Sequence, residues 1–411
     1  MATNRRGKTV TEGERRGLLR ERGNDAAEVA PVELFFDLVY VLAITQVTHH
    51  LLEHLSPRGV AETLVLLLAV WVAWIHVAWS TNYFDLGTRP VRLALLAMML
   101  GSLVMSASIP GAFAARGLAF AAALVAIRGG WTLFLLVAVG WRHHLGVVFA
   151  RVLAWDVAFG VLLLAGGLAA GSLRLVLWIL AVGAIYGAMW ARFPVPGLGR
   201  SRTSDYTIVG ALMAHRWLLF VILALGESIL IIGANFGELP SSATTTAAFG
   251  VAFVGSAALW WLYFDRAEEG GMRVMRAAAD PGALALSAYT YFHIPMVAGI
   301  VAVAAGDELL IAHPDEAADA WTAALVVGGP LFFLTGQLLF KRALWRRVSH
   351  SRLVAIAALA LLLPLGVGRP TLGLALAATG VLVALAAWDL VAEALGLRPA
   401  VPAEPDARAF D

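Results

Sequence analysis

The stretch from Pro31 to His54 has the apolar composition of a membrane-spanning helix, yet it carries many ionisable side chains. Its polar residues are Glu33, Asp37, Gln46, His49, His50, Glu53 and His54. Because charge inside a bilayer is costly, such residues are expected to serve a functional site or to pair with one another. The chemistry open to them is proton exchange, ion pairing or metal binding.

On a helix, these polar residues fall into two stripes. Glu33 and Asp37 are four residues apart and share one face, while Gln46, His49 and His50 belong to a second face. Two polar stripes on one span argue against a lipid-facing orientation. The alternative interpretation of Glu33 is that it caps the start of the helix, where the helix dipole favours a negative charge. Asp37 lies a full turn deeper and predicts a buried pairing.

The sequence from His50 to His54, HLLEH, matches the zinc-protease pattern H-x-x-E-H. The spacing puts both histidines on one helical face with Glu53 beside them. No third ligand can be placed, and a zinc site needs at least three protein ligands. An interfacial polar cluster is the preferred interpretation, and we expect neither a metal nor a cofactor.

A second candidate stretch runs from His215 to Ser228 and contains Arg216 and Glu227. Glu227 lies about 16 Å beyond Arg216 along a helix, near the middle of the bilayer. At that distance it cannot pair with Arg216 and needs another partner or a proton. The small neighbours Gly226 and Ser228 leave a purely structural, hydrogen-bonded glutamate as the alternative.

Other candidate residues come from later spans. Arg128 and Asp156 lie at similar depth and predict a buried ion pair, whose plainest role is to fix helix register. His293 stands among apolar residues, either as a hydrogen-bonded core histidine or as a proton carrier. Asp85 and Asp265 each end a span, are followed by arginines, and predict salt bridges that hold two halves together.

Composition defines the class of protein that must position these side chains. Of 411 residues, 60% are hydrophobic and 14% are charged, and the mean hydropathy is +0.79. A soluble chain is about 45–50% apolar and about 25% charged. Apolar runs of about 20 residues follow one another, which indicates an all-α integral membrane protein. The chain has no cysteine, so disulfides, thiol catalysis and Cys-ligated metals are excluded.

Twelve spans can be drawn between turn and breaker signals. They run over 32–54, 60–83, 90–110, 117–140, 146–170, 173–191, 213–236, 242–264, 281–305, 320–340, 352–368 and 371–394. We expect a disordered basic segment at 1–30, a six-helix half at 31–191, a cytoplasmic linker at 192–212, a second six-helix half at 213–395 and a disordered tail at 396–411. Residues 1–30 lack the pattern of a removable signal peptide.

The distribution of basic residues predicts the topology. With a cytoplasmic amino terminus, 25 of the 30 Lys and Arg fall in or beside inner segments, Arg128 lies within a span, and only Arg58, Arg116, Arg174 and Arg369 lie outside. This asymmetry is what the positive-inside rule expects, with both termini cytoplasmic. The basic residues are scattered, without stacking aromatics, so nucleic-acid binding is not expected.

Short matches indicate an internal duplication. Tyr83-Phe84-Asp85 and Tyr263-Phe264-Asp265 are 180 residues apart and end the second and eighth spans. Gln46 of the first span corresponds to Glu227 of the seventh. Six spans separate the copies, and because six is even the halves have the same orientation. The expected fold is therefore about twelve transmembrane helices in two parallel six-helix halves.

The two polar stretches also carry a family resemblance. Glu33-Leu34-Phe35-Phe36-Asp37-Leu38-Val39, followed by Ala43-Ile44-Thr45-Gln46, resembles the opening of the bacterial low temperature requirement A family. Leu225-Gly226-Glu227-Ser228-Ile229 resembles that family's motif in the seventh span. The resemblance covers about residues 25–395. It implies a multi-pass protein of the bacterial plasma membrane that is linked to growth in the cold, and it implies no particular biochemical activity.

Three hypotheses for function follow. The leading one is a transporter- or channel-like protein for a small solute or ion, with a polar site between the halves that includes Asp37 and Glu227. The second is an intramembrane enzyme that acts on a lipid or isoprenoid, with Asp37 or Glu227 as general acid or base. The third is a structural or stress-adaptation protein whose polar groups serve helix packing. The sequence does not decide whether the protein is an enzyme, and it leaves the oligomeric state open.

Overall fold

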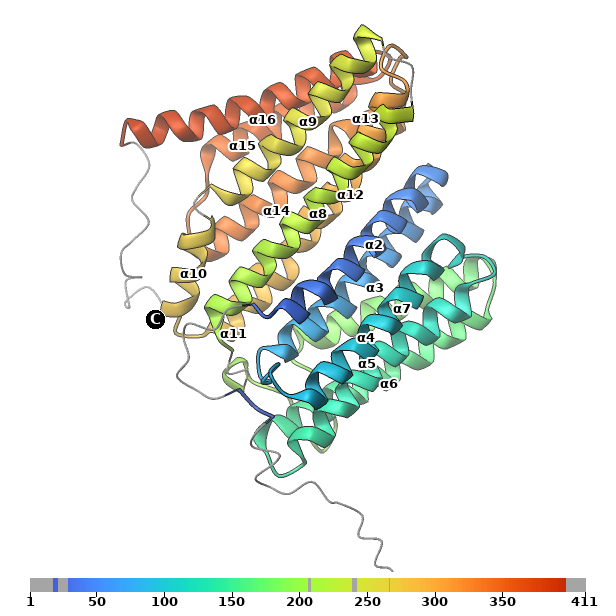
Figure 1. Cartoon of the computed structure of the whole chain (residues 1–411), viewed down its shortest axis with the longest axis vertical. Coiled ribbons are helices and arrows are strands. Elements are labelled where there is room, and N and C mark those ends of the chain that lie inside the picture. The colour runs from blue at the N-terminus through green and yellow to red at the C-terminus, as the bar shows by residue number, and fades with distance from the viewer. Residues whose placement is uncertain (1–17, 21–28, 206–207, 239–241, 266, 397–411) are drawn as a thin grey trace, which may run out of the picture.

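A computed structural model describes residues 18–20, 29–205, 208–238, 242–265 and 267–396, and this part of the chain is built of helices (Figure 1). Eleven of its helical segments are long and apolar enough to cross a membrane. They are α2 (Pro31–Glu53), α3 (Pro57–Thr81), α4 with η1 (Arg89–Gly111), α5 (Gly117–Val139), α6 (His144–Leu168), α7 (Gly171–Trp190), α8 (Gly210–Ala234 of Gly210–Glu238), α9 (Ala243–Phe264), α11 to α12 (Pro281–Ala312), α13 with α14 (Ala320–Trp345) and α16 (Thr371–Ala394).

The remaining predicted span forms the shorter helix α15 (His350–Gly366). Its 17 residues would extend about 25 Å, somewhat less than the roughly 30 Å of a hydrocarbon core. Two further short elements, η2 (Thr203–Asp205) and α10 (Ala267–Ala277), lie outside the long helices. The multi-helix membrane architecture is thus confirmed, with boundaries shifted by a few residues.

The ninth predicted span is longer and less regular than expected. It consists of α11 (Pro281–Leu284), a π-helical segment η3 (Ala285–Tyr291) and α12 (His293–Ala312). Pro295, the third residue of α12, has no N–H to donate into the preceding turn, which favours an irregular start. The wide π turn places the backbone carbonyls of Tyr289 and Thr290 opposite Trp217 of α8 and Trp71 of α3, and the carbonyl of Ala288 opposite His293 of α12.

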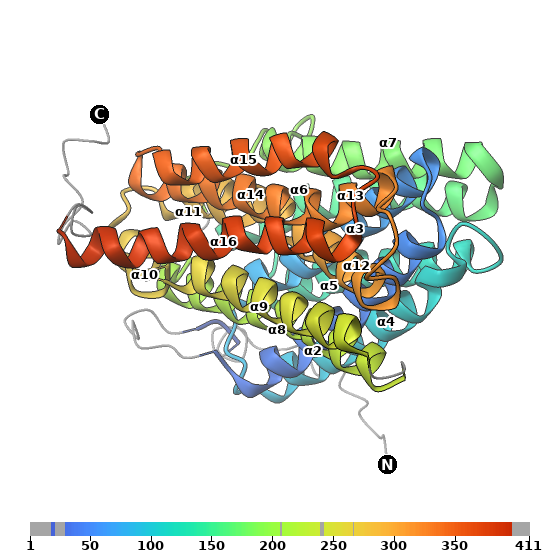
Figure 2. The same cartoon turned by 90° about the horizontal axis from the view of Figure 1, so that it is seen from above.

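The long helices gather in two groups that follow chain order. Figure 1 shows α2–α7 together on one side and α8–α16 on the other, and Figure 2 shows that the long helices run roughly alongside one another. The groups meet where α2 and α3 pack against α8 and α12. The end at which α2 begins, α3 ends and α8 begins is called the Pro31 end below.

The two groups have the same pattern of neighbours. The principal packed pairs of the first group are α2–α3, α2–α4, α3–α5, α3–α7, α4–α5, α5–α6 and α6–α7. The counterparts in the second group are α8–α9, α8–α12, α9–α14, α9–α16, α12–α14, α14–α15 and α15–α16. The duplication into parallel halves stays a prediction, and this one-to-one correspondence is the structural argument for it.

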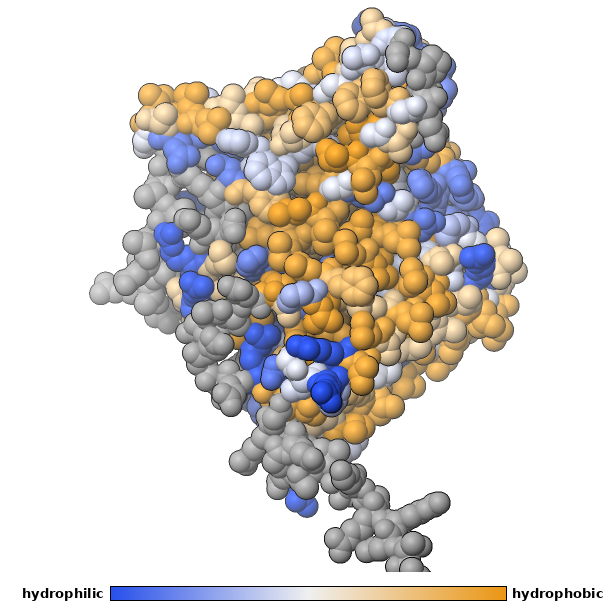
Figure 3. Space-filling view, in the orientation of Figure 1, coloured by the Kyte–Doolittle hydropathy of each residue, from blue (hydrophilic) through white to orange (hydrophobic). Residues whose placement is uncertain are grey.

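Apolar side chains cover much of the outer surface. Large exposed residues such as Leu100, Val137 and Leu361 project from the helices away from the core. In Figure 3 apolar residues cover the middle of the visible face, and hydrophilic residues gather toward its edges. An exposed apolar area of this extent is expected of a surface that contacts lipid.

The predicted disordered segments lie mostly outside the described residues. Part of the first segment differs from the prediction, because residues 18–20 pair with the loop after α3. Arg20 donates its backbone N–H to the carbonyl of Tyr83 (3.0 Å), and Asp85 donates its backbone N–H to the carbonyl of Leu18 (2.9 Å). Leu18 and Leu19 pack against the core there, which explains the local order.

Candidate functional site

The most strongly charged buried cluster joins α2 to α8. Arg216 of α8 donates from Nη1 to Glu33 Oε1 at 2.8 Å and from Nη2 to Asp37 Oδ1 at 3.1 Å. All three side chains are at most 2% exposed. Glu33 and Asp37 share a helical face, so one guanidinium reaches both carboxylates. These residues are called the triad below.

Helix α3 supplies further hydrogen bonds to the triad. Thr81 donates its hydroxyl to Glu33 Oε1 at 2.9 Å and accepts from Arg216 Nη1 at 2.5 Å. Trp74 donates its indole N–H to Asp37 Oδ1 at 2.7 Å. Glu33 Oε2 also accepts the backbone N–H of Ala30 at 3.0 Å. The capping role considered for Glu33 is therefore present together with an ion pair.

Aromatic rings shield the triad. The guanidinium of Arg216 lies 5.7 Å from the ring of Phe36 and 5.9 Å from that of Trp74. Trp74 in turn packs edge-to-face on Trp217 at 4.7 Å. These contacts add cation–π attraction and exclude water, so the charges interact in a low-dielectric environment.

The buried pairing predicted for Asp37 is present, but its partner was not foreseen. Arg216 was counted among the inner-segment residues, yet it lies in α8, six residues past the helix start, and is buried. Depth in the membrane could have indicated the pairing, because Glu33 and Arg216 both lie within about two turns of the start of their helices, and these starts are at the same end of the bundle. The same reasoning correctly paired Arg128 with Asp156.

The predicted pair of Arg128 and Asp156 links α5 to α6. Arg128 donates from Nε and Nη2 to Asp156 Oδ1, at 2.9 and 2.5 Å, and from Nη1 to the Val72 carbonyl of α3 at 2.9 Å. Thr132 donates to Asp156 Oδ2 at 2.7 Å, and its oxygen lies 2.9 Å from His76 Nε2. Three helices are joined, which is the register-fixing role expected of such a pair.

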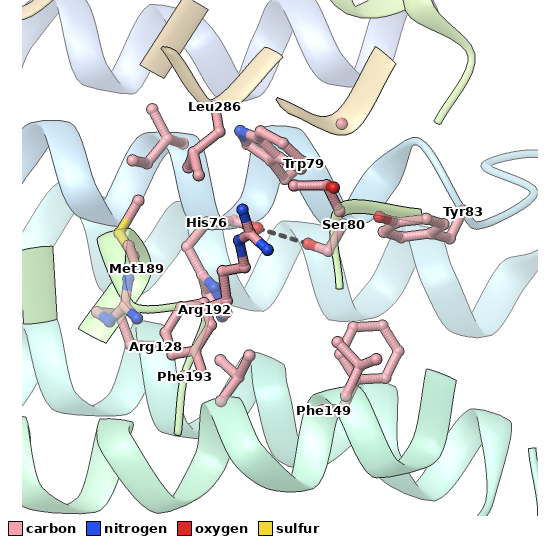
Figure 4. Close-up of a pocket in the computed structure, with 15 residues that line it drawn as sticks. His76, Trp79, Ser80, Tyr83, Arg128, Phe149, Met189, Arg192, Phe193 and Leu286 are labelled. Atoms are coloured by element: carbon pink, nitrogen blue, oxygen red, sulfur yellow. Dashed lines mark hydrogen bonds between the residues drawn. The ribbon is translucent and has the colours of Figure 1, made fainter. Parts of the chain in front are cut away.

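A cavity of about 90 Å³ lies beside this network. Its wall combines apolar side chains with a few polar ones (Figure 4). The lining residues are Ile75, His76, Trp79, Ser80, Tyr83, Arg128, Val148, Phe149, Val152, Met189, Arg192, Phe193, Thr203, Gly282 and Leu286. Helices of the first group, the linker residue Thr203 and η3 of the second group all contribute to it. We call it the α3 cavity.

The α3 cavity extends from the Pro31 end toward the middle of the bundle. Tyr83 and Arg192 lie just past the ends of α3 and α7 at that end. Arg128 lies eleven residues before the end of α5, about 16 Å along the helix. That depth is about half of a 30 Å hydrocarbon core. The cavity thus reaches from one end to a buried charged pair at mid-depth.

The other sequence candidates lie elsewhere. Glu227 and Ser228 are buried in α8, about three turns beyond Arg216, and within the described residues the Ser228 hydroxyl has no hydrogen-bond partner. Gln46 is half-buried on α2. His293 is fully buried and bonded through both ring nitrogens, to Tyr263 Oη at 2.8 Å and to the Ala288 carbonyl at 2.9 Å. Asp37 is held by Arg216 and Trp74, so the structure does not bring it to Glu227.

The first of the two repeat-related aspartates does not form the expected salt bridge within the described residues, while the salt bridge expected of Asp265 stays a prediction. Asp85 is exposed and accepts the backbone N–H of Gly87 at 2.8 Å, a local turn contact in place of the predicted salt bridge. The carboxylate of an aspartate can accept the backbone N–H of the residue two positions later, which is a common contact in turns. Asp265 lies just after α9.

In the HLLEH motif, the rings of His50 and His54 stack with their centroids 4.4 Å apart. The described residues contain no metal-binding group of three or more ligands.

Sequence reasoning also missed a polar bridge in the second group. Gln337 of α14 donates to the Leu262 carbonyl of α9, and its oxygen accepts from Arg352 Nε of α15 at 2.7 Å. Arg352 also pairs with Asp389 of α16 at 3.0 Å. In the first group Arg128 of α5 likewise bonds a carbonyl of α3 and a side chain of α6. The two bridges occupy corresponding helices.

Comparison with known proteins gives the chain's relatives. The family described as bacterial low temperature requirement A protein (LtrA) matches residues 28–387. An uncharacterized protein of Rhizobium meliloti (strain 1021) is 34% identical over 343 residues, which cover 83% of this chain and 84% of the relative. No solved structure matches the chain.

Proposed function

The chain belongs to the bacterial low temperature requirement A family, and we propose that it is a transporter-like membrane protein whose solute path includes the α3 cavity. The observation that carries the proposal is the cavity itself, which leads from the Pro31 end to the Arg128–Asp156 pair at mid-depth. Transporters built of repeats bind substrate near the bilayer midplane, between their halves.

The composition of the wall supports a solute site. Ligand pockets are mostly apolar and contain a few placed polar groups. Here Trp79, Phe149 and Leu286 provide apolar surface, while His76 and Ser80 provide polar groups. On the topology predicted from the basic residues, the Pro31 end faces the cytoplasm of a bacterial cell. A small solute entering from that side would meet Arg128 after about half the crossing.

The position of the cavity between the two groups supports a path that can change shape. Its wall combines α3, α6 and the end of α7 with η3 of the second group. A rocking motion of one group against the other would therefore open or close it, as in alternating access. The intramembrane-enzyme alternative lacks this support, because neither Asp37 nor Glu227 lines the cavity.

Proteoliposomes test the proposal. Wild-type protein is reconstituted, and uptake is measured for small organic anions, organic cations, neutral solutes and alkali cations. Leu286→Trp would fill the cavity, and the matched control Leu361→Trp alters a lipid-facing leucine that is 64% exposed. We expect at least one class to be taken up by wild type and the control, and uptake to be lost in Leu286→Trp. Absence of any protein-dependent flux, or full flux in Leu286→Trp, would contradict the proposal.

A further inference from the structure

The triad contains two carboxyl groups and one guanidinium. If Glu33 and Asp37 were both ionised, the buried cluster would carry one uncompensated negative charge. Arg216 is the partner of both carboxyls, and all three side chains are at most 2% exposed. An isolated charge away from water is strongly unfavourable, and a buried group takes up a proton instead.

The hydrogen bonds of the two carboxyls differ, and the difference favours Asp37 as the proton-binding group. Both oxygens of Glu33 accept hydrogen bonds, Oε1 from Arg216 and Thr81 and Oε2 from the backbone of Ala30. Asp37 is different: Oδ1 accepts from Arg216 and Trp74, while Oδ2 is buried and has no partner. Because Oδ2 accepts no hydrogen bond, it is the carboxyl oxygen of the triad that can carry a hydrogen without displacing a donor.

Among the described residues, the elements packed around Asp37 place no cation other than Arg216 in contact with it. Helix α3 presents Trp74 and Thr81, which are uncharged, and α8 presents Arg216 alone. From α4, Ser102 donates to Tyr40 of α2 at 3.0 Å and Ser106 donates to the Val39 carbonyl at 3.5 Å, and both serines are uncharged. On α12, His293 is engaged by Tyr263 and Ala288. The charge of Asp37 is therefore governed by Arg216 and by the competing carboxylate of Glu33.

We propose that Asp37 binds an exchangeable proton and that this proton is the coupling ion of the protein. The coupling role rests on the proposed transport function, whereas the proton-binding role does not. Release breaks the O–H bond, leaves its electron pair on Oδ2 and passes the proton to a water molecule that reaches Oδ2 when α2 and α8 move apart. Because Arg216 belongs to α8 and Asp37 to α2, the ionised form would draw the guanidinium away from Glu33. Protonation thus changes the contact between the two helix groups.

Infrared difference spectroscopy of purified protein tests proton binding without any transport assay. The C=O stretch of a neutral carboxyl is compared between wild type and variants at neutral pH. We expect Asp37→Asn to lose one neutral-carboxyl band. The control Asp156→Asn should lose none, because both Asp156 oxygens accept hydrogen bonds and Arg128 is its own paired cation. An unchanged band in Asp37→Asn would overturn the proposal.

Two further comparisons test the charge argument. Glu33→Gln removes one of the competing carboxylates, so Asp37 should ionise as the sole partner of Arg216 and its band should vanish. Persistence of the neutral-carboxyl band in Glu33→Gln would overturn the argument that Glu33 forces the proton onto Asp37.

The spectrum of the wild type is also measured in sodium-containing and in sodium-free buffer. A band that forms only without sodium would mean that a sodium ion neutralises the site, which would overturn the assignment to a proton.

Transport tests the coupling role separately. In proteoliposomes, a pH gradient should drive accumulation of a transported solute by wild type and fail to drive it in Asp37→Asn, while solute exchange at equal concentrations persists. Gradient-driven accumulation in Asp37→Asn would overturn coupling. If no protein-dependent flux is found at all, the transport function fails, and the infrared result still decides whether Asp37 holds a proton.

Discussion

Arg216 Nη1 lies 2.8 Å from Glu33 Oε1, although 183 residues separate the two along the chain. This contact bridges the two helix groups at one end of the bundle, and Asp37 extends it through a second bond to the same guanidinium. A buried arginine that serves two carboxyls on another helix specifies how α2 and α8 fit together. Removal of the arginine should therefore affect the whole assembly.

We predict that Arg216→Met destabilises the protein by about 3–5 kcal/mol, because it leaves the buried carboxylate of Glu33 without its cation and removes a hydrogen bond to Asp37. Arg216→Lys should recover little of this loss, since one ammonium cannot reproduce the fork that reaches Glu33, Asp37 and Thr81. The thermal midpoint in detergent measures both. Arg369→Met, at an exposed position, is the control and should change stability by no more than about 0.5 kcal/mol. Equal midpoints for Arg216→Met and wild type would contradict the prediction.

The Arg128–Asp156 pair gives a prediction about compensation. Asp156→Leu alone leaves Arg128 buried beside apolar residues and should cost about 3–5 kcal/mol. Arg128→Met combined with Asp156→Leu removes both charges, and most of that loss should be recovered, because buried pairs are often replaceable by apolar residues. The double variant is compared with both single variants by thermal unfolding. A double variant as unstable as the sum of the singles would show that the two residues act independently.

The sequence predicted the membrane architecture because apolar runs and breakers are local signals. The twelve spans follow from composition, and α15 alone falls short of a full crossing. The Arg128–Asp156 pair could be predicted from depth, because short loops fix the relative depth of neighbouring helices. The π-helical segment η3 could not, since it depends on contacts that Trp71 and Trp217 make with its carbonyls from other helices.

The partner of Asp37 was harder to predict for a physical reason. Arg216 lies beside a loop in the sequence, where a basic residue is ordinarily solvated and marks the cytoplasmic side. Arg174 is a similar case: it was assigned to an outer loop, yet it is buried and donates to the carbonyls of Gly166, Ala169, Ala112 and Ala114. Only the packing of α8 on α2 and of α7 on α6 shows that these guanidiniums are interior. Charge counts along the chain do not carry that information.

Close contact between α12 and α14 depends on glycine. A Cβ on Gly299 would lie 2.6 Å from the Phe333 backbone nitrogen and 2.8 Å from the Gly329 oxygen. Because these are backbone atoms, Gly299→Ala must push the helices apart, and we expect a loss of about 1–3 kcal/mol. Gly233→Ala on α8 meets no atom within 4 Å and should be neutral or stabilising by up to about 1 kcal/mol. The thermal midpoint of Gly299→Ala should therefore fall below that of the wild type, while the midpoint of Gly233→Ala should stay unchanged or rise.

Asp319 gives a prediction about pH. It caps α13 by accepting the Thr322 backbone N–H at 2.7 Å, and this hydrogen bond holds the pKa of the Asp319 carboxyl below its ordinary value of 3.8. Since the folded pKa is depressed, the stabilisation is complete above the unfolded pKa and is lost as the pH falls through the folded pKa. Asp319→Ala should cost about 1 kcal/mol at neutral pH. The difference between its thermal midpoint and that of wild type should shrink below pH 3.8, and a constant difference would contradict this account.

The absence of native cysteine makes the α3 cavity accessible to a labelling test. Val152 and Leu286 line the cavity, so a cysteine at either position should react with a membrane-impermeant maleimide if water fills the cavity. On the predicted topology, labelling should occur in inside-out vesicles and be slow in right-side-out cells. Leu361→Cys, which faces lipid, should remain unlabelled from both sides because thiolate formation requires water. Equal labelling of Leu286→Cys and Leu361→Cys would mean that the cavity is closed to solvent and cannot be the entrance to a solute path.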